Sequence, residues 1–88
     1  MNEGKRFIYI LENYLFYDGS SILFVSDNLK KTLAEFEKTE KKQGYGYTIK
    51  KYPFNVFCDD YRFGEKVKHQ EFREDGLWEW NGDDWVKL

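Results

Sequence analysis

One stretch of this chain has the apolar periodicity of a helix, and the segments on both sides of it alternate as strands do. In residues 28–43, Leu29, Leu33 and Phe36 recur at helical spacing, while most other positions are charged or polar. Such a narrow apolar stripe can cover one face of a sheet. The sequence therefore predicts an α+β domain, in which one amphipathic helix packs on one face of an antiparallel sheet.

Start and stop signals flank this predicted helix. Ser26 and Asp27 stand before it, and both residue types are good N-caps. Lys41 and Lys42 suit the negative end of a helix dipole, and Gly44 follows where a left-handed C-cap is favoured. We therefore expect the helix to run through the whole stretch.

Five to six strands are predicted around the helix, in the order ββα followed by further strands. Asp18-Gly19-Ser20 and Asn81-Gly82-Asp83 are turn signals, and the second predicts a C-terminal hairpin over residues 77–88. Pro53 cannot donate to a sheet ladder, so we expect it at an edge, a bulge or a strand end. The other predicted strands cover residues 6–17, 22–25, 45–50 and 67–73, and residues 54–58 continue the third of these as a short strand.

Length and composition limit the chain to one small domain, residues 1–88. It has 88 residues, of which Phe, Tyr and Trp make up 20%. These rings can fill a thin core, which argues against disorder, and no apolar run is long enough to span a membrane. The net charge of −2 is too small for a nucleic-acid footprint. The lone Cys58 cannot form an internal disulfide, so we expect a reducing, cytoplasmic location.

The sequence holds few signals for catalysis. Cys58 and His69 are the residue types of a nucleophile and its base, but nothing in their sequence context supports a pairing. The same two residues with Asp59 and Asp60 match no compact metal-ligand spacing. We therefore expect a protein that is not an enzyme, with no catalytic residues, metal or cofactor.

The segment Gly44-Tyr45-Gly46-Tyr47-Thr48 resembles the core motif of the RNA-recognition motif family, whose strand aromatics stack on bases. It departs from that family at Gln43, where the family has Lys or Arg, and at Lys50, where the family ends in an aromatic residue. No second helix is predicted after Pro53 either. We therefore interpret the two tyrosines as packing on or beside the helix, with Gly46 at a bulge.

A nucleic-acid function without that family remains as an alternative hypothesis. Rings and cations interleave along this strand, an arrangement that can bind single-stranded RNA by stacking and charge. The residues of this alternative site are Tyr45, Tyr47, Lys50, Lys51 and Tyr52.

The last predicted hairpin holds all three tryptophans of the chain. In a strand, Trp78 and Trp80 point to the same face, and Trp85 can lie opposite one of them across the turn. The cluster either closes the core or exposes one or more rings as a protein-binding hot spot. In the second interpretation, the partner-binding residues are Trp78, Glu79, Trp80, Asp83, Asp84 and Trp85.

The W-x-W-x-G-x-x-W segment at residues 78–85, in a short, aromatic-rich and mildly acidic chain, resembles small accessory proteins of phages and prophages. Some of these block a host protein, so the resemblance implies an inhibitor that acts in the host cytoplasm. We expect a protein-binding domain whose aromatic and acidic surface docks on a basic surface of a host enzyme. A homodimer or larger homo-oligomer, paired through an exposed strand edge at the tail, is the third hypothesis.

Overall fold

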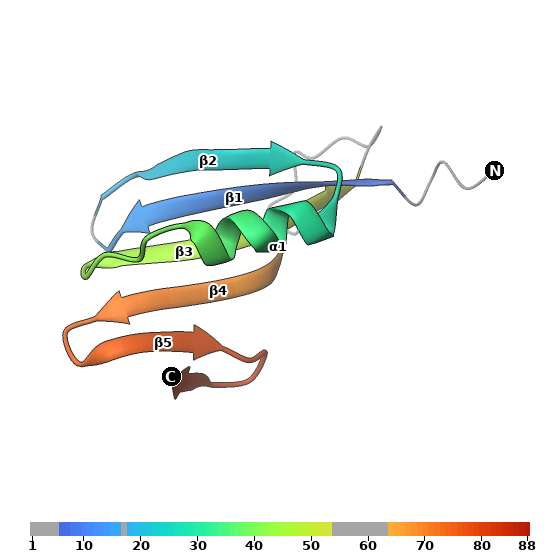
Figure 1. The fold of residues 1–88 in the computed structure, drawn as a ribbon. Helices are drawn as coiled ribbons and strands as arrows, with labels where there is room; N and C mark the ends of the chain where they lie inside the picture. The colour runs from blue at the N-terminus through green and yellow to red at the C-terminus, as the bar shows by residue number, and fades with distance from the viewer. Residues whose placement is uncertain (1–5, 17, 54–63) are drawn as a thin grey trace.

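The fold is an antiparallel sheet with one helix on one of its faces. The computed structural model describes residues 6–16, 18–53 and 64–88, and within these residues there is one six-stranded sheet in the order β2-β1-β3-β4-β5-β6 (Figure 1). This confirms the predicted α+β class. The elements are β1 (Phe7–Leu15), β2 (Ser20–Ser26), α1 (Leu29–Lys38), β3 (Tyr45–Pro53), β4 (Glu65–Arg73), β5 (Gly76–Trp80) and β6 (Trp85–Lys87).

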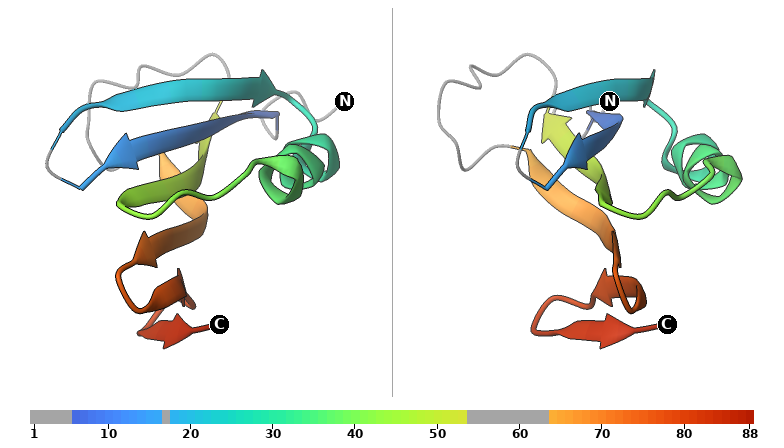
Figure 2. Two further views of the ribbon diagram at one scale, coloured as in Figure 1. Left: turned by 60° about the vertical axis from the view of Figure 1, so that its left-hand side comes forward. Right: turned by 90° about the vertical axis from the view of Figure 1, so that its left-hand side faces the viewer.

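The helix covers only one end of the sheet. It contacts β1, β2 and β3, and Figure 2 shows it to one side of these strands, with β4 to β6 projecting beyond it. Phe36 on the helix packs with Leu11 and Ile49, which are directly opposite each other in β1 and β3. Tyr47 completes this fully buried core. The sheet therefore has one face that the helix covers and one face that no helix of the described residues covers, here called the open face. Strands β4 to β6 continue the sheet beyond the helix.

The helix is shorter than predicted at its C-terminal end. Its N-cap is Asn28, whose side chain accepts the N–H of Lys31 at 3.0 Å, and not Ser26 or Asp27. It ends at Lys38 because Thr39 takes an extended conformation, with a ψ of 125°. The Lys41 ammonium then turns back and donates to the carbonyl of Thr39 at 2.9 Å. Lys41 thus satisfies a free carbonyl from outside the helix.

Two strand irregularities shape the sheet, and neither lies at Gly46, where a bulge was predicted. Leu23 is an extra residue in β2, because Leu11 pairs with Phe24 and Glu12 with Ile22. Val67 is an extra residue in β4, because Ile49 pairs with Lys68 and Lys50 with Lys66. Pro53 is the last residue of β3 and also the last described residue of this segment. The predicted strand over residues 54–58 lies outside the described residues.

Candidate partner-binding site

The hairpin of β5 and β6 is closed by an Asn81 turn. The side-chain oxygen of Asn81 accepts the backbone N–H groups of Asp83 and Asp84, both at 2.9 Å, and its own N–H donates to the carbonyl of Asp84. Gly82 has a φ of 104°, which residues other than glycine rarely adopt. The Asn-Gly signal therefore corresponds to a real turn, and this turn brings Trp85 directly opposite Trp80.

The three tryptophans share the open face, as strand alternation predicts. The rings of Trp80 and Trp85 are 5.6 Å apart between centroids. The Arg73 guanidinium lies 4.7 Å from the ring of Trp85 and 5.0 Å from that of Trp78, in cation–π geometry. Trp78 also donates its indole N–H to Asp75. Trp78 and Trp85 are half-buried, whereas Trp80 is 38% exposed.

A buried polar network supports this cluster from β1 and β4. The Tyr14 hydroxyl lies 2.6 Å from Nε2 of His69 and donates to Oε2 of Glu71, also at 2.6 Å. The Tyr14 hydroxyl donates its single proton to Glu71, so it can only accept a hydrogen bond from His69. The N–H of the neutral imidazole is therefore at Nε2, which donates to the Tyr14 oxygen. His69 in turn packs edge-on against Trp85, with 4.8 Å between ring centroids. Residues 14 and 85, far apart in sequence, are thus joined through one imidazole.

Burial keeps His69 and Tyr14 in their neutral forms. Burial of the imidazole, followed by the charge of Lys66, lowers the pKa of His69 to about 4. Burial and then the hydrogen bond to Glu71 raise the pKa of the Tyr14 hydroxyl. At neutral pH, His69 is therefore an uncharged imidazole and Tyr14 an intact phenol. Both act as fixed hydrogen-bonding groups behind the tryptophans.

The carboxylates of the hairpin do not surround the tryptophans as predicted. Glu79 points to the other face of β5, where it accepts hydrogen bonds from Gln70 at 2.7 Å and Lys68 at 2.9 Å. The Gln70 hydrogen bond and then Lys68 lower the pKa of this carboxyl. Asp83 and Asp84 are exposed at the turn. Glu79 therefore belongs to a separate polar cluster, and of the three predicted carboxylates Asp83 and Asp84 belong to the turn between Trp80 and Trp85.

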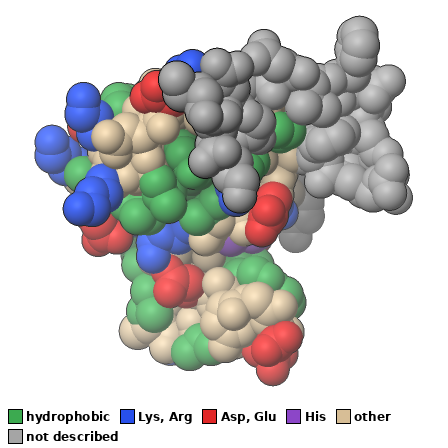
Figure 3. Space-filling view, turned by 90° about the vertical axis from the view of Figure 1, so that its right-hand side faces the viewer, with side chains coloured by type: hydrophobic (Ala, Val, Ile, Leu, Met, Phe, Trp, Pro, Cys, Tyr) green, Lys and Arg blue, Asp and Glu red, His purple; other side chains and the backbone are tan. Residues whose placement is uncertain are grey.

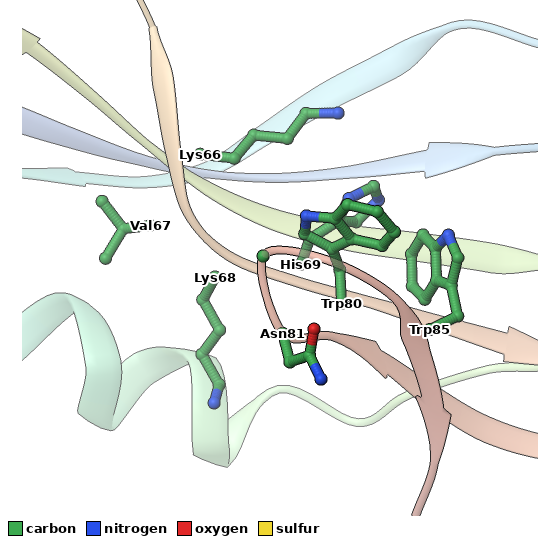
Figure 4. A pocket seen from close by; sticks show the side chains of 8 residues that line it. Lys66, Val67, Lys68, His69, Trp80, Asn81 and Trp85 are labelled. Carbon is green, nitrogen blue, oxygen red and sulfur yellow. The ribbon is translucent and has the colours of Figure 1, made fainter.

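An open pocket of about 570 Å³ lies between β4 and the β5–β6 turn. Figure 4 shows Lys66, His69 and the Trp80 ring on one side of β4, while the Lys68 side chain extends toward the helix. The space-filling view shows the molecule narrowing above the β5–β6 hairpin (Figure 3). The residues that line the pocket are Lys66, Val67, Lys68, His69, Trp80, Asn81, Gly82 and Trp85.

The five residues of the predicted nucleic-acid site do not form one surface. Tyr45 and Tyr47 stack on the helix-covered face with centroids 6.3 Å apart, and Tyr47 is only 2% exposed. Lys51 lies on that face too, over the ring of Phe7. Alternation along β3 places Lys50 and Tyr52 on the other face. The stacking platform predicted for this strand is therefore wrong: Tyr47 is a core residue.

Each member of the split set also has a structural partner. The Tyr47 hydroxyl accepts the N–H of Lys42 at 2.8 Å. Lys50 is paired with Glu12 at 3.1 Å, and the Tyr52 ring lies where a side chain on Gly64 would be. These contacts explain the positions of the Tyr47, Lys50 and Tyr52 side chains, and no bound nucleic acid is needed to explain them.

Within the described residues, no three His, Cys, Asp or Glu side chains are grouped so that they could hold a metal ion. Cys58, Asp59 and Asp60 lie outside the described residues. The Cys58–His69 pair and the metal set of Cys58, Asp59, Asp60 and His69 are therefore not described by the structure. No helix in the described part of the chain is long and apolar enough to cross a membrane.

Comparisons of the chain with protein-family models, with curated proteins and with solved structures found no match in any of the three. The function is therefore argued from the residues of the site itself.

Sequence reasoning missed the contribution of β4 to this site. It considered His69 only as a base or metal ligand, and it gave Lys66 and Val67 no role. Strand alternation could have placed Glu79 on the other face of the sheet from the tryptophans, because it stands between Trp78 and Trp80 in one strand. Nothing local in the sequence indicates that β4 would pass beside the Asn81 turn.

Proposed function

We propose that this chain is a non-enzymatic protein-binding domain that contacts its partner through Trp80 and the adjoining pocket. The observation that carries the proposal is the exposure of Trp80, a large apolar ring that is 38% exposed at the rim of the pocket. Tryptophan is enriched among binding hot spots, which are anchors in well-packed surroundings. Here the neighbour that packs against the anchor is Trp85.

The setting of Trp80 also favours binding because it is held in place before a partner arrives. Trp85 is fixed between His69 and Arg73, and His69 is fixed by Tyr14. A surface that is already ordered loses less side-chain freedom on association, so more of the contact energy appears as affinity. This supports Trp80 as an anchor more than as a ring left over from the core.

A domain of this kind would act by occupying a surface of its partner. We extend the proposal to inhibition, the mode implied by the resemblance of residues 78–85 to phage accessory proteins. A stoichiometric blocker requires a stable interface and no reacting groups. The exposed Asp83 and Asp84 beside the anchor would steer it toward a basic surface.

Self-association is a second candidate, and one observation favours it. The edge strand β2 contains no charged residue, and its Ile22 side chain is 60% exposed. Uncharged apolar edges pair readily with another strand, whereas charges on an edge prevent this. Light scattering over a concentration series would show a dimer, and I22K would convert it to monomer. A monomer at all concentrations removes this candidate.

The first proposal is tested by site-specific photo-crosslinking in cells that carry the gene. A benzophenone amino acid replaces Asp83, exposed on the turn beside Trp80, in one variant and the exposed Lys30, on the helix, in a control variant, so that Trp80 is kept in both. We expect a discrete adduct at position 83 and none at position 30. The recovered protein is then purified and its affinity measured against the native chain and W80A. Equal adducts at both positions, or equal affinities, would overturn the proposal.

A further inference from the structure

Strand β4 is paired on both sides along only half of its length. Its residues 70–73 pair with β5, through Gln70 opposite Glu79 and Arg73 opposite Gly76. Residues 65, 66, 68 and 69 pair with β3, and Val67 forms the β4 bulge, but no strand of the described residues pairs with them on the other side. An unpaired strand edge presents backbone N–H and C=O groups to any further strand. Within the described part of the chain, this half of β4 therefore has an unpaired edge on which a further strand can be added.

The open half of β4 and the pocket are the same place. Lys66, Val67, Lys68 and His69 form one wall, and the other wall is Trp80 with the Asn81 turn (Figure 4). The pocket is thus a groove with a strand edge on one side and an exposed ring on the other. Val67, the extra residue of the β4 bulge, is 38% exposed within it. An extended chain laid in the groove would meet backbone groups and an apolar surface together.

The charge of the groove indicates what such a chain would carry. The cations around it are neutralised: Lys68 by Glu79, Lys50 by Glu12 and Arg73 by Glu71. Lys66 is exposed and forms no ion pair within 4.0 Å with any carboxylate of the described residues. It points to the same side of β4 as His69 and Trp80 (Figure 4). Among the described residues, Lys66 is therefore the cation of the β4 wall that has no carboxylate partner, while the exposed Asp83 and Asp84 belong to the turn beyond Trp80.

We propose that the groove binds an extended segment of the partner that carries an acidic side chain. The segment adds as a strand to residues 65–68 of β4, rests an apolar side chain on Trp80, and places a carboxylate on Lys66. Main-chain hydrogen bonds give such a complex its affinity, and alternate side chains give it specificity. This inference rests on the proposed protein-binding function and specifies the segment that the same site recognises.

The test begins with random peptides of about ten residues, the upper range of a strand, displayed on phage and selected on the native chain. Binders that also bind W80A are discarded. We expect the remaining sequences to share an acidic residue and an apolar residue an even number of positions apart, because such residues lie on one face of a strand. A consensus without acids, or with helical spacing, would overturn the inference.

A charge exchange and a backbone change then test the two contacts separately. K66E should weaken the best peptide by about tenfold or more, and replacing its acid by Lys should restore binding to K66E. N-methylation of alternate peptide residues should abolish binding in one of the two registers only, because only one set of N–H groups faces β4. K30E, on the exposed surface of the helix, is the matched control and should change nothing.

The outcomes separate this inference from the function on which it rests. If Trp80-dependent peptides bind without any effect of K66E or N-methylation, the site binds protein but not as an acidic added strand. If selection gives no Trp80-dependent binder while the crosslinked partner still requires Trp80, the partner offers a folded surface and the inference is wrong. If neither peptide nor partner depends on Trp80, the proposed function itself fails.

Discussion

The phenol ring of Tyr14 lies on the backbone of Gly46, in the space that a side chain at position 46 would occupy. The two residues are directly opposite each other in β1 and β3. Only a glycine in β3 lets the ring cross the strand so that its hydroxyl reaches His69 and Glu71 on β4. Through His69, this contact links β1 to the tryptophan cluster.

Replacing Gly46 by Ala should therefore destabilise the domain. A glycine within a strand is normally less stable than alanine, so a gain would be expected if the space were free. Here the new methyl group displaces Tyr14 from its hydrogen bonds, and we expect a loss of about 1–3 kcal/mol. Chemical denaturation measures this, with G19A as control because nothing lies within 4 Å of a Cβ there. A neutral or stabilising G46A would show that Tyr14 is not held in this position.

Stability should fall as the pH is lowered from about 6.5 to about 4 through His69. The folded imidazole has its pKa lowered to about 4, and the unfolded one has its ordinary pKa near 6.5. Between these values the unfolded state binds more protons, so the stabilisation is complete above the window and is lost as the pH falls through it. The loss should be about 3 kcal/mol at most.

The variant H69Q isolates the contribution of His69 to stability, which is needed because Asp and Glu carboxylates titrate in the same pH range. The difference in unfolding free energy between the native chain and H69Q should shrink as the pH falls from 6.5 to 4. A difference that stays constant across the window would mean that His69 is not buried in its neutral form.

Loss of the helix N-cap should have a local and moderate cost. The Asn28 side chain accepts the N–H of Lys31, and N28A removes that acceptor at a cost of about 1 kcal/mol. N28S should retain most of the stability, because serine also caps well. D27A is the control, since in the described part of the chain the Asp27 side chain forms an exposed ion pair with Arg6 at 4.0 Å and does not cap the helix. Equal losses in N28A and D27A would contradict the assigned cap.

Trp80 and Trp85 should differ in what they contribute to stability. W80A removes a ring that is 38% exposed, and we expect it to cost about 1 kcal/mol and to leave unfolding cooperative. W85A removes the ring between His69, Arg73 and Trp80, and we expect a cost of about 3 kcal/mol. Thermal and chemical unfolding measure both. If W80A unfolds the domain, Trp80 is a core residue and not an anchor.

The class of fold could be predicted because alternation and helical spacing are local properties. Strand alternation also placed Trp78, Trp80 and Trp85 on one face correctly. The end of the helix could not be predicted in the same way. Residues 39–43 are as polar as the outer face of the helix, and only the extended backbone of Thr39 ends it at Lys38.

The site itself depended on contacts that sequence does not show. Tyr14 and His69 are 55 positions apart, and their hydrogen bond exists because β1, β3 and β4 lie side by side. Tyr47 is buried because the helix covers the face of the sheet to which Tyr47 points. The rings and lysines of β3 therefore do not form a surface on which bases could stack. The groove arises because β5 pairs with only half of β4.

The most direct test of the central claim is the affinity of the crosslinked partner for the native chain and for W80A, measured with both proteins purified and folded. We predict that W80A binds at least about thirtyfold more weakly, the effect of losing a hot-spot residue worth about 2 kcal/mol, while its unfolding remains cooperative. An unchanged affinity for a folded W80A would contradict it, because the exposed ring would then have no part in binding.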